Sequence, residues 1–300
     1  MKTNPELNII FTIDEKFIQH FSVTLVSILE NNADLKLTFY VIHDIVCQDN
    51  LIKVVEFAEE KYNIKINLIQ IDPNTFNSFT TNLHYSKAVY FRLLFTEILP
   101  DAIDKMLFID ADTVVTGSLR SLADYNFGDL MLLCVNDVQQ DHHIKRLHDL
   151  GFPISHYFNA GVLLINLKGW RGVGAAKDLM ELAETYMSRI SWWDQDLLNM
   201  YFYGRWDYMD NTFNGIDLKD ENQPPPTIIH FSGPFKPWLY RFDPPFKRLY
   251  WQYLKLTPFR DVGFPDKNFK NFIKKVYYPF RDTYFPNLKF VNVKSLFKRK

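Results

Sequence analysis

The stretch Lys105-Met-Leu-Phe-Ile-Asp-Ala-Asp-Thr113 is an apolar segment that ends in two carboxylates, Asp110 and Asp112. On an extended backbone, residues two apart project from the same face, so both carboxylates can reach one point. They repel each other there unless a proton or a cation lies between them, and a hard divalent ion such as Mn²⁺ or Mg²⁺ suits an oxygen-rich site. The stretch therefore predicts a buried strand with a metal site at its C-terminal end. The alternative is that Asp112 caps a turn and Asp110 is merely solvated.

The segments before this stretch alternate between strand and helix patterns. Apolar runs predict strands over residues 7–13, 37–42 and 64–71, and helical spacing of apolar residues predicts helices over residues 17–30, 50–62 and 87–98. This order predicts a parallel, doubly wound α/β sheet. Ligands bind such sheets beyond the carboxyl ends of the strands. Because Asp14 and Asp110 both follow strands, we expect them to share one cleft.

The segments after the stretch are less regular. Further strands are predicted over residues 130–135, 161–166 and 227–231, and helices over residues 175–190 and 195–203. Residues 137–156 contain four histidines and few apolar residues. This composition predicts a mobile loop over a site.

The composition is that of a globular protein. Of the 300 residues, 47% are hydrophobic and 23% are charged, and this length permits one large α/β domain or two small ones. The formal net charge of −1 argues against general affinity for nucleic acid. Cys47 and Cys134 lie in or beside apolar runs, which fits buried thiols in a reducing compartment. We expect neither a signal peptide nor a membrane-spanning helix, and hence a cytoplasmic protein.

A second motif, His230-Phe-Ser-Gly-Pro-Phe-Lys-Pro-Trp238, follows the last predicted strand. His230 can supply a nitrogen to a metal already held by carboxylates. Gly233 lets backbone N–H groups approach an oxyanion, and Lys236 offers a positive charge to phosphate. Taken alone, His230 is better explained as a hydrogen-bonded core histidine. Together with Lys236 and the aspartate pair, the metal interpretation is favoured.

A third motif, Trp192-Trp-Asp-Gln-Asp196, opens a predicted helix. Its acidic residues can cap free N–H groups and complement the helix dipole. Tryptophans beside carboxylates are also typical of a sugar site. Asn159, in His156-Tyr-Phe-Asn-Ala-Gly161, could orient a hydroxyl group or belong to an ordinary turn. Arg92 could pair with phosphate or with the aspartates, or form a structural ion pair.

These motifs, in this order, resemble those of the family 8 glycosyltransferases, and most closely the bacterial lipopolysaccharide galactosyl- and glucosyltransferases. The resemblance covers about residues 7–240. The matching segments are Asn8-Ile-Ile-Phe-Thr-Ile-Asp14, Tyr90-Phe-Arg92, Phe108-Ile-Asp-Ala-Asp112, Phe158-Asn-Ala-Gly161, Asp194-Gln-Asp196 and His230-Phe-x-Gly-x-x-Lys-Pro-Trp238. An Asp-x-Asp pair alone is common, but the ordered set is specific.

The resemblance implies a GT-A fold, a mixed and largely parallel Rossmann-like sheet flanked by helices. It implies a retaining transfer of glucose or galactose from UDP-glucose or UDP-galactose to an oligosaccharide or glycolipid acceptor, such as a lipopolysaccharide or lipooligosaccharide core. It also implies Mn²⁺, with Mg²⁺ as a substitute, bound by Asp110, Asp112 and His230.

The resemblance assigns donor contacts to further residues. Asp14 contacts uracil, Thr12 lies nearby and Phe17 stacks on the base. The residues expected around the diphosphate and the sugar are Arg92, Asp110, Ala111, Asn136, Asp137, Asn159, Ala160, Gly233 and Lys236, with Asp194, Gln195 and Asp196 as the catalytic candidates.

Two positions depart from the family pattern. Where many relatives place an aspartate, this chain has Val135-Asn136-Asp137, which leaves open whether Asn136 or Asp137 touches the sugar. Relatives often have a polar residue two positions after Asp14; here it is Lys16, so base recognition can differ in detail.

The expected chemistry fits these residue types. Departure of UDP builds negative charge on the β-phosphate, which a divalent metal, Lys236 and backbone donors would stabilise. The sugar becomes oxocarbenium-like. Gln195 is an amide and a poor nucleophile, so we favour front-face attack by the acceptor, with Gln195 supporting the cation. The alternative is a covalent intermediate on Asp196.

The C-terminal region is strongly basic. Residues 247–300 contain fourteen Lys and Arg against three Asp. The aromatic residues among them include Trp251, Tyr253, Phe272, Tyr277, Tyr278, Phe290 and Phe297. This mixture predicts attachment to an anionic membrane surface, and a folded helical cap with a solvated basic face is the alternative. We therefore expect a catalytic domain over residues 1–245, a membrane-associating region over residues 246–300, and a peripheral location on the inner face of the cytoplasmic membrane.

Two other functions fit part of the pattern. The run Phe108-Ile-Asp-Ala-Asp-Thr-Val-Val115 also resembles the nucleophile strand of haloacid-dehalogenase-type phosphatases. That family needs a later acidic cluster that binds Mg²⁺, and no such cluster follows here. The other alternative is a non-catalytic protein that binds a sugar nucleotide, although every expected catalytic position is filled.

Overall fold

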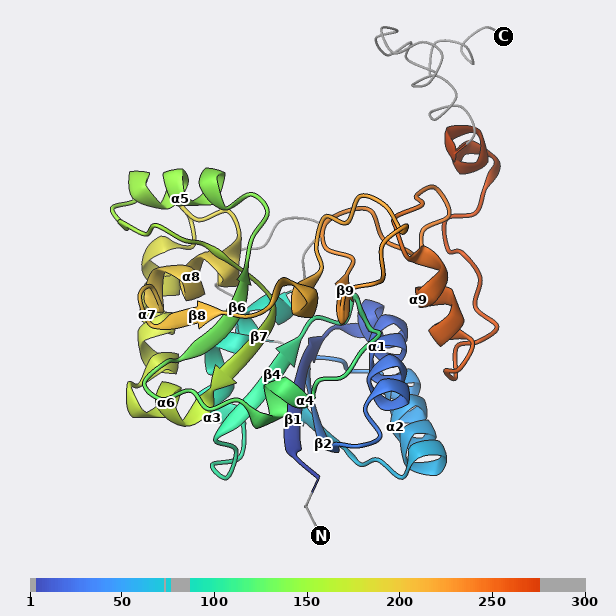
Figure 1. The fold of residues 1–300 in the computed structure, drawn as a ribbon, viewed down its shortest axis with the longest axis horizontal. Helices are drawn as coiled ribbons and strands as arrows, with labels where there is room; N and C mark the ends of the chain where they lie inside the picture. Colours follow the sequence, from blue (N-terminus) through green and yellow to red (C-terminus); the bar gives the residue numbers. More distant parts are fainter. Residues whose placement is uncertain (1–3, 73, 77–86, 276–300) are drawn as a thin grey trace, which may run out of the picture.

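The computed structural model describes residues 4–72, 74–76 and 87–275. A seven-stranded sheet in the order β3-β2-β1-β4-β7-β6-β8 runs through the molecule (Figure 1). Its strands are β1 (Glu6–Ile13), β2 (Lys36–His43), β3 (Ile66–Gln70), β4 (Lys105–Ile109), β6 (Leu132–Asn136), β7 (Phe158–Asn166) and β8 (Trp206–Tyr208). A two-stranded antiparallel sheet joins β5 (Thr113–Val115) to β9 (Ile228–His230).

The sheet is largely parallel, as the sequence predicts. Strands β3, β2, β1 and β4 pair in parallel, with Ile10 of β1 beside Tyr40 and Phe108. Strand β7 runs antiparallel to both β4 and β6, and β8 is parallel to β6. The expected mixed α/β sheet is therefore confirmed. Because β7 runs against β4, its first residues, Phe158–Gly161, lie beside the carboxyl end of β4.

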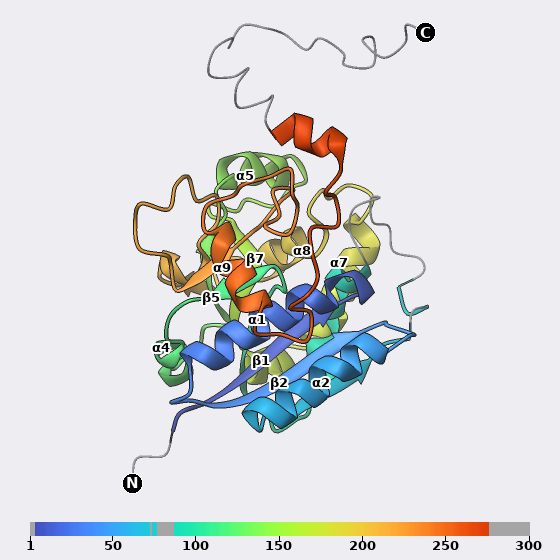
Figure 2. The same ribbon diagram turned by 90° about the vertical axis from the view of Figure 1, so that its right-hand side faces the viewer.

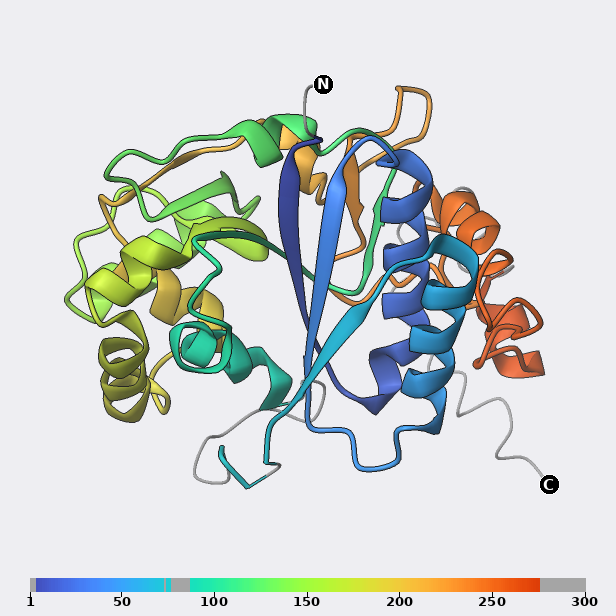
Figure 3. The ribbon, with the colours of Figure 1, turned by 90° about the horizontal axis from the view of Figure 1, so that it is seen from below.

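Helices cover both faces of the sheet (Figure 3). One face packs against α1 (Ile18–Asn31), α2 (Asp49–Tyr62) and α4 (Arg120–Asp124). The other packs against the 3₁₀ helix η2 (Lys87–Leu94), α3 (Phe95–Ile98), α6 (Leu167–Gly172), α7 (Ala175–Tyr186) and α8 (Trp193–Tyr201). Side chains alternate between the two faces of a strand, so Ile9 and Phe11 enter the first core and Ile10 enters the second. Both cores hold the carboxyl ends of the strands in fixed positions.

A third cluster of buried apolar side chains joins the C-terminal helix α9 (Lys247–Leu254) to α1 and the small sheet (Figure 2). Tyr250 and Leu254 of α9 pack there with Val23 and Ile229. Residues 246–254 therefore share a hydrophobic core with α1. Tyr277, Tyr278, Phe290 and Phe297 lie outside the described residues. In the part of the chain that the structure describes, no helix is both long enough and apolar enough to cross a bilayer.

Two segments differ from the sequence prediction. The helix expected over residues 87–98 is the 3₁₀ helix η2 followed by the single turn α3. The loop expected over residues 137–156 contains the helix α5 (Gln140–Asp149). The prediction of a mobile loop was wrong because His143 of α5 is buried and faces the Asp137 carboxylate, a contact that apolar periodicity does not detect. Short 3₁₀ turns η1 (Glu15–Phe17) and η3 (Asn211–Asn214) complete the fold.

Candidate active site

The two aspartates lie in a turn between β4 and β5. The extended backbone that the sequence suggested ends at Ile109, and the turn itself brings Asp110 and Asp112 together. Backbone contacts hold this turn on both sides: Asp110 N–H donates to the Gly161 carbonyl at 2.8 Å, and Phe231 N–H donates to the Asp112 carbonyl at 3.0 Å. The turn is therefore held by β7 on one side and by the residue after β9 on the other.

Asp110, Asp112 and His230 form a group that could hold a metal ion. His230 Nε2 lies 3.3 Å from Asp112 Oδ1 and 3.8 Å from Asp110 Oδ2. One possible ligand atom from each residue lies within 4.8 Å of the other two. Two carboxylate oxygens and an imidazole nitrogen are donors that suit Mn²⁺ and that Mg²⁺ also accepts in part. The predicted set of ligands is thus brought together, and it fits the expected metal.

A chain of hydrogen bonds fixes the orientation of His230. Gly161 N–H donates to Asn159 Oδ1 at 3.0 Å, which identifies that atom as the acceptor. Asn214 Nδ2 also donates to Asn159 Oδ1, at 3.0 Å, so Asn214 Oδ1 is left to face His230 Nδ1 at 2.8 Å. An amide oxygen only accepts, so Nδ1 donates its proton to Asn214, and Nε2 is the nitrogen that faces the aspartates. Histidines that bind metals are commonly oriented in this way.

The two carboxylates have different electrostatic surroundings. Burial raises the pKa of Asp110, Arg92 offsets this in part, and the neighbouring Asp112 adds to it. Burial also opposes ionisation of Asp112, but Lys236 and His230 outweigh it and hold the pKa of Asp112 well below its ordinary value. A cation placed between the two would favour the ionised form of both.

Lys236 joins the second sequence motif to the aspartate turn. Its Nζ pairs with the Asp112 carboxylate and donates to the Phe231 carbonyl at 2.7 Å. Gly233 has φ of +72°, a conformation that glycine adopts without strain. Trp238 stacks on His20 of α1, with ring centroids 3.5 Å apart, and meets Phe17 edge-on at 6.2 Å. The loop after β9 is therefore packed against the start of α1.

Asp14 and Thr12 lie at the carboxyl end of β1, the strand beside β4. The Asp14 carboxylate accepts hydrogen bonds from the N–H groups of Lys16 and Phe17, at 2.9 and 3.2 Å, and so caps η1. Asp14 and Asp110 thus lie at the same edge of the sheet, each directly after one of two neighbouring strands. Phe17 extends this edge toward Trp238 and the Lys236 loop.

Arg92 joins the aspartate turn to the third motif. Its Nη2 lies 3.2 Å from Asp110 Oδ1, and its Nη1 lies 3.0 Å from Asp194 Oδ2 and donates to the Ala160 carbonyl at 2.7 Å. The guanidinium also lies over the Phe108 ring, 4.1 Å from its centroid. Burial, together with the nearby Asp110, raises the pKa of Asp194 to about 6. Arg92 lowers this pKa, but offsets the rise only in part. Arg92 thus forms ion pairs with two carboxylates of the site, those of Asp110 and Asp194.

Gln195 and Asp137 lie together beside these ion pairs. Gln195 Oε1 accepts from Ala160 N–H at 2.9 Å, and its Nε2 donates to Asp137 Oδ2 at 3.3 Å. Asn159 Nδ2 donates to the same Asp137 oxygen at 3.0 Å. Burial opposes ionisation of Asp137, but its hydrogen bonds from His143 and Asn159 lower its pKa to about 2. Of the two residues left open by the sequence, Asp137 joins this network through its side chain.

Asp196 has a different environment from Asp194 and Gln195. It is 0% exposed, and its Oδ2 accepts from the N–H groups of Ser191 and Trp192, each at 2.9 Å. Its Oδ1 accepts from the Tyr157 hydroxyl at 2.7 Å and pairs with Arg146 at 2.5 Å. Asp196 therefore caps the start of the helix, which is the structural role that the sequence allowed for this motif.

Several supporting residues were not found from the sequence. Asn214 and Arg146 carry no motif, and their partners are distant in the chain. Thr24 is a third case: its hydroxyl lies 3.0 and 2.7 Å from the carbonyl oxygens of Ala111 and Thr113 and so links α1 to the aspartate turn. The one available signal was Thr24 itself, a polar residue on the apolar face of a predicted helix.

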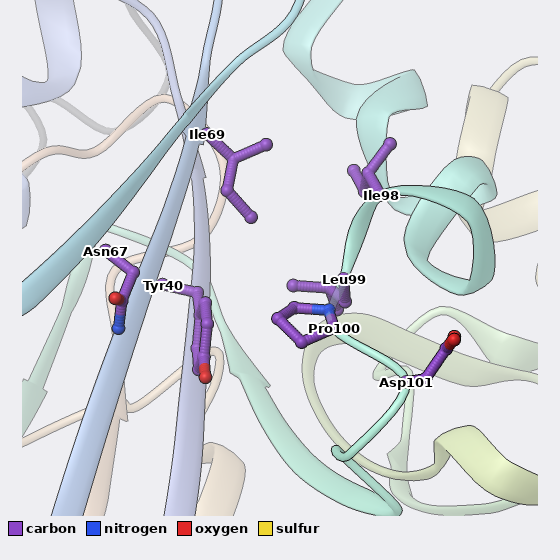
Figure 4. A pocket seen from close by; sticks show the side chains of 7 residues that line it. All are labelled: Tyr40, Asn67, Ile69, Ile98, Leu99, Pro100 and Asp101. Carbon is purple, nitrogen blue, oxygen red and sulfur yellow. The ribbon is translucent and has the colours of Figure 1, made fainter.

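A separate groove of about 420 Å³ lies away from these residues (Figure 4). Tyr40, Asn67 and Ile69 of β2 and β3 line one side of it. Ile98, Leu99, Pro100 and Asp101, at the end of α3 and in the turn before β4, line the other. None of the predicted site residues lines this groove.

The chain matches the sequence model of glycosyl transferase family 8 over residues 8–241. It belongs to glycosyl transferase family 8. Among curated relatives, it is 29% identical to the lipopolysaccharide 1,3-galactosyltransferase of Salmonella typhimurium over 78% of this chain and 73% of the relative. It is 26% identical to the lipopolysaccharide 1,2-glucosyltransferase of Escherichia coli over 87% and 81%. The general stress protein A of Bacillus subtilis is 25% identical over 89% and 100%.

Solved structures of a glycosyltransferase agree with this assignment. The galactosyltransferase LgtC, in complex with donor and acceptor sugar analogues, is 28% identical, with a TM-score of 0.73 over 84% of this chain and 96% of LgtC. A glutamine-to-glutamate active-site mutant of LgtC superposes with the same TM-score at 26% identity. The expected GT-A fold and glycosyltransferase class are thus confirmed, and the phosphatase alternative has no support.

Proposed function

We propose that this family 8 chain transfers glucose or galactose from UDP-glucose or UDP-galactose to a saccharide acceptor, with Mn²⁺ and with retention of configuration. The observation that carries the proposal is the group Asp110, Asp112 and His230, with Lys236 paired to its second aspartate. This group lies at the carboxyl edge of the sheet, where α/β folds bind nucleotides.

In this proposal Asp110, Asp112 and His230 hold Mn²⁺, or Mg²⁺ in its place. The ion would neutralise negative charge on the diphosphate as UDP departs. Lys236 would then leave Asp112 and contact a phosphate oxygen. Gly233, whose φ is +72°, would let backbone N–H groups approach the diphosphate. Each of these groups stabilises charge that develops in the transition state.

The remaining donor contacts follow the order of the motifs. Asp14, Thr12 and Phe17 would hold the uridine, and Ala111 lies between the two proposed metal ligands. The buried ion pair of Arg92 with Asp194 supports a role in orienting sugar hydroxyls. Asn136, Asp137, Asn159 and Ala160 would complete the wall beside the sugar. Asp137 is favoured over Asn136 because it bonds both Asn159 and Gln195.

Front-face attack by the acceptor is the favoured route to retention. Both Asp196 oxygens are committed to buried partners, so a covalent intermediate on Asp196 would require breaking several hydrogen bonds. Among the described residues, Gln195 Oε1 accepts one N–H, that of Ala160. A carbonyl oxygen has two lone pairs, so the second remains for a positive centre on the sugar. An LgtC variant at an active-site glutamine has been solved, which supports the choice of Gln195.

The acceptor is proposed from the relatives. Two of them are named as lipopolysaccharide galactosyl- and glucosyltransferases, so a lipopolysaccharide or lipooligosaccharide core is the first acceptor to test. Such an acceptor lies at the cytoplasmic face of a membrane. The basic region supports attachment there, since Lys267, Lys270 and Lys274 alternate with the exposed Phe269 and Phe272.

Release of UDP tests the central proposal. With purified enzyme and Mn²⁺, we expect UDP release from UDP-glucose or UDP-galactose that rises with an oligosaccharide acceptor and stops with EDTA. Asp112→Asn keeps the side-chain volume and removes the charge, so we expect transfer to be lost while far-UV circular dichroism is unchanged. Asp101→Asn, at a fully exposed carboxylate, is the matched control. Full activity of Asp112→Asn would exclude the metal assignment.

Membrane attachment is tested separately. Removing residues 267–300, which include the alternating lysines and phenylalanines, should reduce co-sedimentation with vesicles that contain anionic lipid, while UDP release with a soluble acceptor persists. Binding that is equal with and without these residues would contradict the proposed membrane role.

A further inference from the structure

The amide of Gln195 is held by contacts that lead to one face of α5. Its Nε2 has two acceptors, Asp137 Oδ2 and the Tyr157 hydroxyl, each at 3.3 Å. The second oxygen of Asp137, Oδ1, lies 3.5 Å from His143 Nε2. Tyr157 donates to Asp196 Oδ1, which pairs with Arg146. Both hydrogen bonds of the amide group thus continue to a side chain of α5.

His143 and Arg146 are three residues apart in the chain, so they lie on the same face of the helix. Figure 1 shows α5 above α8, the helix that carries Gln195. His143 is 2% exposed, and its ring packs on Tyr157, with centroids 4.5 Å apart. One side chain of α5 therefore contacts both acceptors of the amide, Asp137 by a polar contact and Tyr157 by its ring.

The orientation of the amide depends on these contacts. Tyr157 has one hydroxyl proton, and Asp196 accepts it, so the Tyr157 oxygen is free to accept from Gln195. If Asp196 lost Arg146, the buried carboxylate would lack its charge partner and would shift or take up a proton. Tyr157 and then Gln195 would lose their fixed geometry. If Asp137 lost His143, Asn159 and the Gln139 N–H would still hold the carboxylate, but it would lose its contact with α5, and its position beside the amide would be less well defined.

We propose that His143 and Arg146 are positioning residues that hold the Gln195 amide toward the transferring sugar. The inference rests on the proposed function, in which Gln195 lies beside that sugar. Neither residue belongs to the metal group, to the Lys236 loop or to the ion pair of Arg92. The loss of either one should therefore lower kcat and leave binding of Mn²⁺ and UDP intact.

The test compares Arg146→Met and His143→Phe with Arg146→Lys and with Lys145→Met, an exposed neighbour on the same helix. His143→Phe keeps a ring against Tyr157 and removes the nitrogen that faces Asp137. Measurements are kcat and KM for the UDP-sugar, the Kd of Mn²⁺ with UDP by calorimetry, and Tm. We expect kcat to fall on the order of 10- to 100-fold in the first two variants, because small displacements of reacting groups are costly. The Kd should stay within about twofold, and Arg146→Lys should recover most of the rate.

A cycle with Gln195→Ala shows whether His143 acts through Gln195. If it does, His143→Phe has no further effect on the residual kcat of Gln195→Ala. Additive losses, or losses of kcat, Kd and Tm in proportion, would mean a structural role and would overturn the inference. If Arg146→Met does not fold, the double variant Arg146→Met with Asp196→Asn removes the unpaired charge and is measured in its place.

Failure of the inference and failure of the proposed function give different results. An active wild-type enzyme with unaffected variants overturns the positioning role alone. A wild-type enzyme that binds Mn²⁺ and UDP but transfers no sugar overturns both.

Discussion

Gly161 lies where the site leaves no space for a side chain. A Cβ atom added there would lie 2.2 Å from His230 Cε1 and 2.8 Å from Asp110 Oδ2. Real Cβ atoms do not approach other atoms so closely, so a neighbour would have to shift and give up one of its contacts. His230 is held by Asn214, and Asp110 is held by the Arg92 ion pair. The small residue in Phe158-Asn-Ala-Gly161 is therefore a requirement of the proposed metal group.

Gly161→Ala should weaken the metal site without unfolding the chain. The methyl group would move His230 away from the aspartates, and we expect Mn²⁺ affinity to fall on the order of 10- to 100-fold, as for other changes that misplace a ligand. Calorimetric titration with Mn²⁺ in the presence of UDP measures this. Gly172→Ala, where the added Cβ meets nothing within 4 Å, is the control. Equal Mn²⁺ affinity in the two variants would contradict the close approach.

Residue types and order were sufficient to predict that Asp110, Asp112 and His230 lie together, but not which residues support them. Asp110, Asp112, His230 and Lys236 are recognisable because their chemistry is unusual at strand ends. Asn214, by contrast, is one polar residue in an irregular segment. Its link to His230 exists only once β9 and η3 are folded against each other. Such a pairing between distant segments leaves no local trace in the sequence.

At the scale of the element, α1 connects the aspartate turn to the Lys236 loop. Thr24 bonds the turn, and one turn earlier in the helix His20 stacks on Trp238 and bonds the Tyr250 hydroxyl at 2.7 Å. Gln19 donates to the same hydroxyl, and the proton of Tyr250 can then go to His20 Nδ1 when the imidazole is neutral, the form that burial favours. Polar residues of a buried helix face thus serve the site, although periodicity alone assigns that face to the core.

His20 should make the stability of the protein depend on pH. Burial, opposed by Asp112 and aided by Lys236, lowers the pKa of His20 from its ordinary 6.5 to about 3. Between these values the unfolded chain binds a proton that the folded chain does not, so stability is full above pH 6.5 and falls as the pH drops toward 3. The slope from this group is at most about 1.4 kcal/mol per pH unit.

His20→Gln should remove this slope. Urea unfolding from pH 7 to pH 4.5 measures the free energy of unfolding for the wild type, for His20→Gln and for His142→Gln, an exposed histidine used as control. We expect the curve of His20→Gln to be flatter than that of the wild type by about 1 kcal/mol per pH unit. The curve of His142→Gln should follow the wild type. Parallel curves for all three proteins would mean that His20 is not buried in its neutral form.

The helix α5 shows the limit of prediction at this scale. Its inward face carries His143 and Arg146 beside Ile144 and Leu147, so its apolar stripe is short and interrupted by polar residues. Their inward orientation depends on Asp137, which follows β6, and on Asp196 of α8. The strands of the first half were predictable because each one carries its own apolar run.

At the scale of the whole molecule, the site is assembled from both sheets. Asp14 follows β1, the aspartate turn joins β4 to β5, Gly161 is on β7 and His230 ends β9. Sequence order suggested the parallel half, but the antiparallel insertion of β7 between β4 and β6 was not predicted. That insertion is what places the start of β7 beside Asp110. The family resemblance implied the outcome, since local pattern does not encode which distant strands pair.

A ligand bound by so many segments should stabilise the entire fold. Because the unfolded chain has no such site, a ligand at 100 times its Kd adds about 2.7 kcal/mol to the free energy of unfolding. For a chain of 300 residues, that corresponds to an increase in Tm of roughly 4 °C. The two proposed ligands should act together, because Mn²⁺ offsets the repulsion between the aspartates and UDP supplies phosphate oxygens to Mn²⁺ and Lys236. Differential scanning calorimetry with Mn²⁺ alone, UDP with EDTA, and both ligands measures this coupling.

We expect both ligands together to raise Tm by more than the sum of their separate effects. Asp112→Asn should lose this excess, because it lacks one metal ligand and the ion-pair partner of Lys236. Asp101→Asn should keep it, because that carboxylate is fully exposed and distant from the site. An equal shift by UDP in EDTA and in Mn²⁺ would mean that the nucleotide binds without the metal. The group Asp110, Asp112 and His230 would then stabilise the turn and would not bind a diphosphate through a metal ion.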